Sequence, residues 1–128
     1  MPVINIKSLP FEDGVKIHEV LKKLNLSVAS SINYKPDYIW SYWEFIKPEH
    51  YAVGNKVSAK TTKLSHSPII EILSFEGKNK EEIERVLRTT AKVISEELDI
   101  DIGNIFITYK EVLSGMIFDG GDIVFKKS

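Results

Sequence analysis

The strongest constraint on the fold is that the chain repeats itself. The segment PVINIKSL, which begins at Pro2, matches the segment PIIEILSF, which begins at Pro68, and the two prolines are 66 residues apart. Alternation of apolar and polar side chains in such segments is typical of β-strands. An internal repeat of this length predicts two copies of one supersecondary unit.

The match extends beyond the two strands. At the same spacing of 66, a helical pattern in the first copy falls opposite one in the second, and four of the five pairs are apolar on both sides: Ile17, Val20, Leu21, Leu24 and Val28 against Ile83, Val86, Leu87, Thr90 and Ile94. Later positions match at a spacing of 67, which predicts one inserted residue, in the pairs Tyr42 and Tyr109, Glu44 and Glu111, Gly54 and Gly121. We expect residues 1–128 to be a single domain made of two repeats, about 2–55 and 67–123.

Each copy is predicted to be a strand, a helix and a second strand. In the first copy, Asp13 can cap a helix whose apolar stripe runs from Ile17 to Val28, and a strand is expected over residues 38–46 after Pro36. In the second copy, Asn79 and Glu82 form a capping-box pattern ahead of a helix that ends near Leu98. The segments 47–54 and 114–121 are expected to be arms that reach toward neighbouring molecules.

These elements predict the fold class. Two parallel strands joined through a helix form a right-handed crossover, which places the helix on one face of the strands. Two such units predict an α+β fold, an α/β two-layer sandwich in which tandem β-α-β repeats form a four-stranded mixed sheet with two helices on one face. The other face would be apolar and uncovered, with an aromatic-rich strand from Tyr38 to Phe45. Because a monomer rarely exposes a patch of that size, we expect burial against other copies of the chain.

Composition excludes several classes of function. Seventeen basic and eighteen acidic residues are interspersed and give a net charge of -1, so neither nucleic acid nor a membrane is an expected partner. The chain has no cysteine, which favours a cytoplasmic location and excludes thiolate chemistry. The three histidines, His18, His50 and His66, lack the spacing of metal ligands. No metal and no cofactor are expected.

Three motifs resemble those of the tautomerase superfamily, which includes 4-oxalocrotonate tautomerase and macrophage migration inhibitory factor. They are Pro2 at the start of a strand, Glu76-Gly77-Lys78 before a helix, and Glu111 followed by Gly120-Gly121. The chain looks most like the fused-repeat members, in a poorly characterised branch. The resemblance implies a homotrimer, and for that branch it implies no established substrate.

The resemblance implies keto-enol isomerisation of a small α-keto acid or enol, with the amine of Pro2 as general base once Met1 is removed. An α-amine titrates near 8, and burial lowers that pKa toward neutrality. Lys78 is the candidate cation for the substrate, and Lys35 is a weaker candidate, because one gap decides whether Tyr34 or Lys35 takes its position. Phe106 stands where relatives often carry an arginine or a tyrosine, and Thr108 at a position that is polar in some relatives.

Two alternatives to this enzyme follow from the same residues. The chain could be a noncatalytic trimeric binding or structural protein that keeps the scaffold, which the apolar side chain of Phe106 favours. Hydration or dehalogenation is a further option, although the additional acid and paired arginines expected for those reactions are not evident in the sequence.

Overall fold

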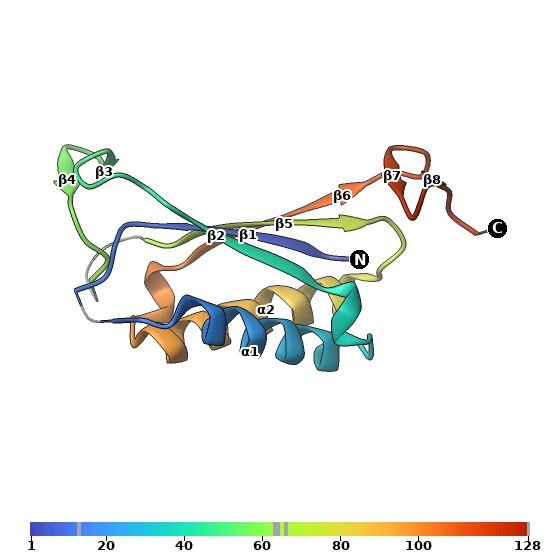
Figure 1. Cartoon of the computed structure of the whole chain (residues 1–128), viewed down its shortest axis with the longest axis horizontal. Helices are drawn as coiled ribbons and strands as arrows, with labels where there is room; N and C mark the ends of the chain where they lie inside the picture. Colours follow the sequence, from blue (N-terminus) through green and yellow to red (C-terminus); the bar gives the residue numbers. More distant parts are fainter. Residues whose placement is uncertain (13, 63–64, 66, 128) are drawn as a thin grey trace.

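The protein has two layers, a four-stranded sheet and a pair of helices that cover one of its faces (Figure 1). The structure is a computed structural model that describes residues 1–12, 14–62, 65 and 67–127. The sheet has the order β2-β1-β5-β6, and the predicted α+β class is confirmed. The main elements are β1 (Val3–Ser8), α1 (Ile17–Ser31), β2 (Trp40–Phe45), β5 (Ile69–Phe75), α2 (Lys80–Leu98) and β6 (Phe106–Val112).

The sheet combines two parallel pairs around an antiparallel centre. β1 pairs with β2 in parallel and β5 pairs with β6 in parallel, and each pair is joined through one helix. β1 and β5 run antiparallel, with Val3 opposite Leu73 and Lys7 opposite Ile69. The two copies therefore point in opposite directions, and the start of β1 lies beside the end of β5.

Strand register shows that the predicted one-residue insertion is wrong. Val3 pairs with Trp40 in the first copy and Ile69 pairs with Phe106 in the second, so the spacing between the copies stays at 66. Tyr42 therefore corresponds to Thr108. Because a slip of one residue moves every side chain to the opposite face of a strand, the match of tyrosines at a spacing of 67 was coincidental.

The hairpins keep the same spacing of 66. In the first copy β3 (Tyr51–Val53) pairs with β4 (Lys56–Ser58), and in the second β7 (Ile117–Asp119) pairs with β8 (Asp122–Val124). Gly54 and Gly120 begin the two turns with φ of 61° and 67°, a backbone conformation that suits glycine. The hairpins overlap the segments 47–54 and 114–121 that were expected to be arms, but end later, at Ser58 and Val124. They project at opposite ends of the sheet (Figure 1).

The two helices begin differently. At α2 the predicted capping box is confirmed: the Asn79 side chain accepts from the Glu82 backbone N–H at 2.8 Å, and the Glu82 carboxylate accepts from the Asn79 N–H at 3.1 Å. At α1 the N-cap is Lys16, without a side-chain cap, and the predicted cap Asp13 lies outside the described residues. The strand expected over 38–46 is shorter than predicted, because residues Pro36–Tyr38 form a 3-10 turn.

The core lies between the sheet and the helices. Its buried side chains come from the inward positions of β1 and β5 and from one stripe of each helix, and include Ile4, Ile6, Val20, Leu24, Val28, Ile70, Ile72, Val86 and Ile94. The opposite face of the sheet, which we call the open face, has no helix over it (Figure 1). There Trp40, Tyr42, Leu73 and Phe106 are 42% to 60% exposed. No helix in the described part of the chain is long and apolar enough to span a membrane.

Candidate active site at the N-terminus

The start of the chain is held at the edge between the two layers. The Pro2 carbonyl accepts a hydrogen bond of 3.0 Å from the Trp40 backbone N–H, and the Pro2 ring is fully buried. Met1, which precedes it, is only partly buried. The antiparallel pairing of β1 and β5 brings the turn after β5 to this point, so that the N-terminus meets residues 75–78.

A polar cavity of about 280 Å³ surrounds the Met1 end of the chain, and we call it the amine cavity. Lys78 enters it from the turn between β5 and α2, Tyr34 from the segment after α1, and Glu82 from the first turn of α2. Its lining is completed by Phe75, Glu76, Gly77, Lys126 and Lys127. The cavity therefore gathers residues from both copies and from the C-terminal segment.

The cavity changes the acid–base behaviour of the amine. Burial, followed by the nearby positive charge of Lys78, lowers the pKa of the Met1 amine from 8.0 to about 6. Both causes disfavour the protonated form. At neutral pH the amine is therefore mainly uncharged, which is the state that a general base requires.

The carboxylate of Glu76, in the lining of the amine cavity, binds the C-terminal segment. Glu76 accepts a hydrogen bond of 2.7 Å from the Ser114 backbone N–H and lies 3.5 Å from the Lys126 ammonium. The hydrogen bond from Ser114 is the main cause that lowers the pKa of Glu76, and Lys126 adds to it. Glu76 is thus engaged with the end of the chain and not with Lys78.

A second cavity adjoins the first at Met1 and Phe75, on the side of the open face. Its volume is also about 280 Å³, and its lining is mostly apolar: Met1, Val3, Trp40, Phe75, Ile117, Phe118, Asp119 and Val124. The N-terminus therefore separates a charged space from an apolar one.

The predicted site residues do not all meet here. Lys78 lines the amine cavity together with Met1, the residue before Pro2, and Tyr34 lines it in place of its neighbour Lys35, which is exposed. Phe106 and Thr108 lie on the open face, and Phe106 pairs with Ile69 at the opposite end of β5 from Phe75. Within one chain neither residue lines the amine cavity.

Sequence reasoning missed Ser74 as a neighbour of Lys78, and it named Tyr34 only as the alternative to Lys35. The Lys78 ammonium donates a hydrogen bond of 2.8 Å to the Ser74 hydroxyl and lies 4.9 Å from the centre of the Tyr34 ring. A signal for Ser74 was available, because it interrupts the inward apolar series of Ile70 and Ile72 with a hydroxyl. The choice between Tyr34 and Lys35 was left open by the sequence, and Tyr34 is the one that lines the cavity.

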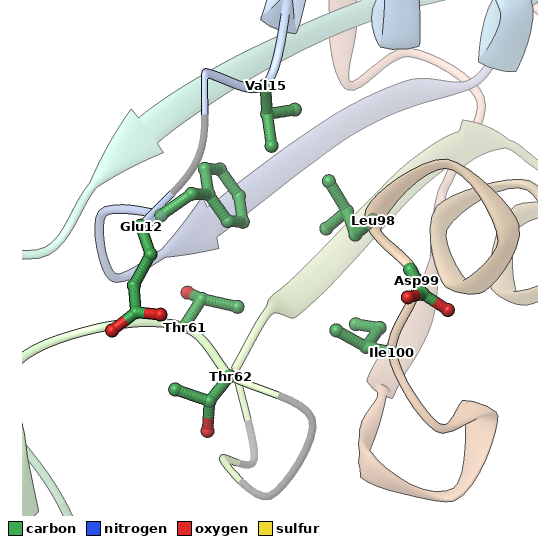
Figure 2. Close-up of a pocket in the computed structure, with 8 residues that line it drawn as sticks. Glu12, Val15, Thr61, Thr62, Leu98, Asp99 and Ile100 are labelled. Atoms are coloured by element: carbon green, nitrogen blue, oxygen red, sulfur yellow. The ribbon is translucent and has the colours of Figure 1, made fainter.

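A third cavity, of about 290 Å³, is the counterpart of the amine cavity in the repeat (Figure 2). Positions 66 residues apart line the two sites, but the chemistry differs: Glu12 stands in place of Lys78, and Ile100 in place of Tyr34. Pro68, the counterpart of Pro2, has its ring nitrogen in the peptide bond to Ser67. None of the described residues that line this cavity carries an amine. The described residues contain no group of three or more metal-ligating side chains.

The two-layer fold of tandem β-α-β units also occurs in solved structures described as fused 4-OT and as macrophage migration inhibitory factor-like. Comparison with solved structures confirms the resemblance to the tautomerase superfamily at the level of the fold. No protein-family model matches the sequence, and no curated protein matches it significantly.

The similar structures are distant in sequence. A fused 4-OT wild-type asymmetric trimer superposes with a TM-score of 0.81 at 14% identity, over 94% of each chain. Pt0534 inactivated by 2-oxo-3-pentynoate gives 0.79 at 14% identity, over 95% of this chain and 94% of that one. A macrophage migration inhibitory factor-like protein from Entamoeba histolytica gives 0.71 at 18% identity, over 95% and 97%.

Proposed function

We propose that the protein is a homotrimeric tautomerase that interconverts the enol and keto forms of a small α-keto acid, with the amine of Pro2 as general base. The observation that carries the proposal is the N-terminus itself, which lies in a cavity where burial and Lys78 keep an α-amine uncharged. We expect the same two causes to act on the amine of Pro2 once Met1 is removed.

The chemistry needs one base and one cation. The Pro2 nitrogen takes the proton of the enol hydroxyl, and the O–H electron pair forms the C=O bond. The electron pair of the C=C bond moves to the carbon next to that carbonyl, and the protonated amine returns a proton to this carbon. Proton balance is kept, and the amine ends as it began. Lys78 holds the carboxylate or the developing enolate oxygen, an electrostatic contribution that grows as charge develops.

Blocking the nitrogen of Pro2 tests the proposal. Chains that begin at Pro2, at Met1, or at an alanine inserted before Pro2 are compared by the ultraviolet absorbance change of an enol pyruvate. Because general base catalysis contributes about 10²- to 10⁴-fold, we expect both blocked forms to lose at least about 100-fold in kcat/KM. Equal rates for the three chains would refute Pro2 as the base.

A noncatalytic trimeric scaffold is the second candidate, and Phe106 favours it. The resemblance implies an arginine or tyrosine at that position, and the phenyl side chain has no polar group to offer a substrate. Mass spectrometry of the protein from its native host distinguishes the two functions. A mature chain that starts at Pro2 supports the enzyme, and one that keeps Met1 supports the scaffold, because its Pro2 nitrogen is an amide.

The proposed trimer is supported by the exposed apolar side chains of the open face and by the similar fused 4-OT structures, whose descriptions name trimers. A trimer would bring the open face and the hairpins of one chain against its neighbours. Phe106 and Thr108, which are remote from the amine cavity of their own chain, would then be available to a neighbouring chain's site.

A further inference from the structure

We propose that Ser74 and Tyr34 are positioning residues, which hold the Lys78 ammonium beside the N-terminal amine through uncharged contacts, so that its positive charge remains available to an anionic ligand. That the anionic ligand is a keto acid rests on the proposed function. The contacts themselves do not depend on catalysis.

Ser74 provides the first contact. It is the last inward-facing residue of β5 and only 1% exposed, and its hydroxyl accepts a hydrogen bond of 2.8 Å from the Lys78 ammonium. A buried serine on a strand cannot move far. It therefore fixes the position of the nitrogen at the end of an otherwise flexible lysine side chain.

Tyr34 provides the second contact from the other copy. The Lys78 nitrogen lies 4.9 Å from the ring centre, within the roughly 6 Å range in which a cation is attracted to an aromatic face. The attraction comes from the ring's quadrupole and leaves the positive charge in place. Two uncharged partners, from different copies, thus hold the ammonium.

The nearby carboxylates of Glu76 and Glu82 bind groups other than Lys78. Glu82 accepts from the Asn79 backbone N–H in the helix cap, and Glu76 accepts from the Ser114 N–H and pairs with Lys126. Among the ion pairs of the described residues, none includes Lys78. A partly buried ammonium without a counter-charge favours binding of an anion, which would restore the electrostatic balance.

Tyr109 lies behind Ser74. Its hydroxyl is buried without a hydrogen bond of good geometry, and burial raises the pKa of Tyr109 while the approach of Ser74 partly offsets that rise. The phenol is therefore protonated at neutral pH. It supports the serine without adding a negative charge beside Lys78.

The experiment uses the chain that begins with Met1, because this form lacks a free Pro2 amine and its result cannot depend on turnover. Two quantities are measured by nuclear magnetic resonance: the pKa of the Met1 amine, and the dissociation constant of oxamate, a keto-acid analogue whose amide does not condense with amines. Lys78→Ala is the reference, and we expect it to raise the amine pKa from about 6 toward 8.

Four variants separate the contacts. We expect Ser74→Ala and Tyr34→Leu each to weaken oxamate binding about 3- to 10-fold and to give part of the rise in amine pKa seen for Lys78→Ala. Ser74→Thr keeps the hydroxyl and Tyr34→Phe keeps the ring, so both should resemble the unmodified chain. Circular dichroism confirms that each variant is folded.

The outcomes are distinct. If Ser74→Ala and Tyr34→Leu change neither the amine pKa nor the dissociation constant of oxamate, the positioning role is wrong. If Tyr34→Phe weakens oxamate binding as much as Tyr34→Leu does, the ring contact is wrong. Shifts in both quantities together with an inactive Pro2 chain would uphold the positioning role and reject the tautomerase. An active Pro2 chain, with no change of either quantity in these variants, would uphold the tautomerase and reject the positioning role.

Discussion

A single charge organises the chemistry at the residue scale. Burial lowers the pKa of the Met1 amine, and the positive charge of Lys78 beside it lowers that pKa further, because two positive charges in a partly buried space repel each other. The lysine thus serves the proposed reaction twice, by keeping the base neutral and by attracting an anion.

The depressed amine pKa makes stability depend on pH. In the Met1 chain this pKa is about 6 when folded and near 8.0 when unfolded, so between pH 6 and 8 the unfolded chain binds more protons. We expect the free energy of unfolding to rise with pH across this window. Because the amine is only partly buried, the slope should be below about 1.4 kcal/mol per pH unit.

Urea unfolding of the free and the Nα-acetylated chain at pH 6 and pH 8 checks this expectation. Acetylation removes the titrating amine, so the difference between the two chains isolates its contribution from that of the histidines. A free chain that gains no more stability than the acetylated one would show that the amine titrates normally in the folded state.

At the scale of secondary structure, the two copies have equivalent strands but unequal helices. α2 has 19 residues and a capping box, whereas α1 has 15 residues and begins at Lys16 without a side-chain cap. The capping box also fixes Glu82, a residue of the amine cavity. Helix capping and the site are therefore coupled in the second copy only.

Removing the α2 cap should cost stability. We expect Asn79→Ala to lower the free energy of unfolding by about 1 kcal/mol, because the backbone N–H of Glu82 loses its acceptor. Lys16→Ala at the α1 N-cap is the matched control and should change little, since Lys16 makes no cap bond. Urea midpoints measure both. Equal losses of unfolding free energy in the two variants would mean that the capping box does not stabilise α2.

At the scale of the whole molecule, the open face is the surface through which we propose that the chain associates. The helices cover one side of the sheet, and the other presents aromatic and aliphatic side chains to solvent. Side chains of this size stabilise an assembly when they are buried, each by about 1.5 to 3 kcal/mol. Association through this face is the economical arrangement.

Sedimentation equilibrium tests that arrangement. We expect a mass three times the chain mass of 14.6 kDa. Leu73→Lys on the open face should shift the protein toward the monomer, because it would bury an unpaired charge in each interface. Leu26→Lys on α1 is the matched control at an exposed leucine and should leave the mass unchanged. A trimer that tolerates Leu73→Lys would place the interface elsewhere.

The sequence by itself determined the elements, the layers and one half of the site. Periodicity located both helices, the Asn79 capping box and the strands that Pro2 and Pro68 open, because local hydrogen bonding and burial depend on neighbours along the chain. The repeat predicted that each copy contributes strands to one layer and a helix to the other. The motif around Lys78 could also be predicted, since it is a contiguous turn between a strand and a helix.

Only the tertiary structure decided which distant residues meet. The antiparallel pairing of β1 with β5 brings Lys78 to the N-terminus, and the end of α1 brings Tyr34 there instead of Lys35. Register settled that the copies are 66 residues apart throughout, although tyrosines matched at 67. The physical reason is that strand register, and the face of the sheet on which each side chain lies, are set when the strands pair. Matching two segments of sequence residue by residue does not reveal either.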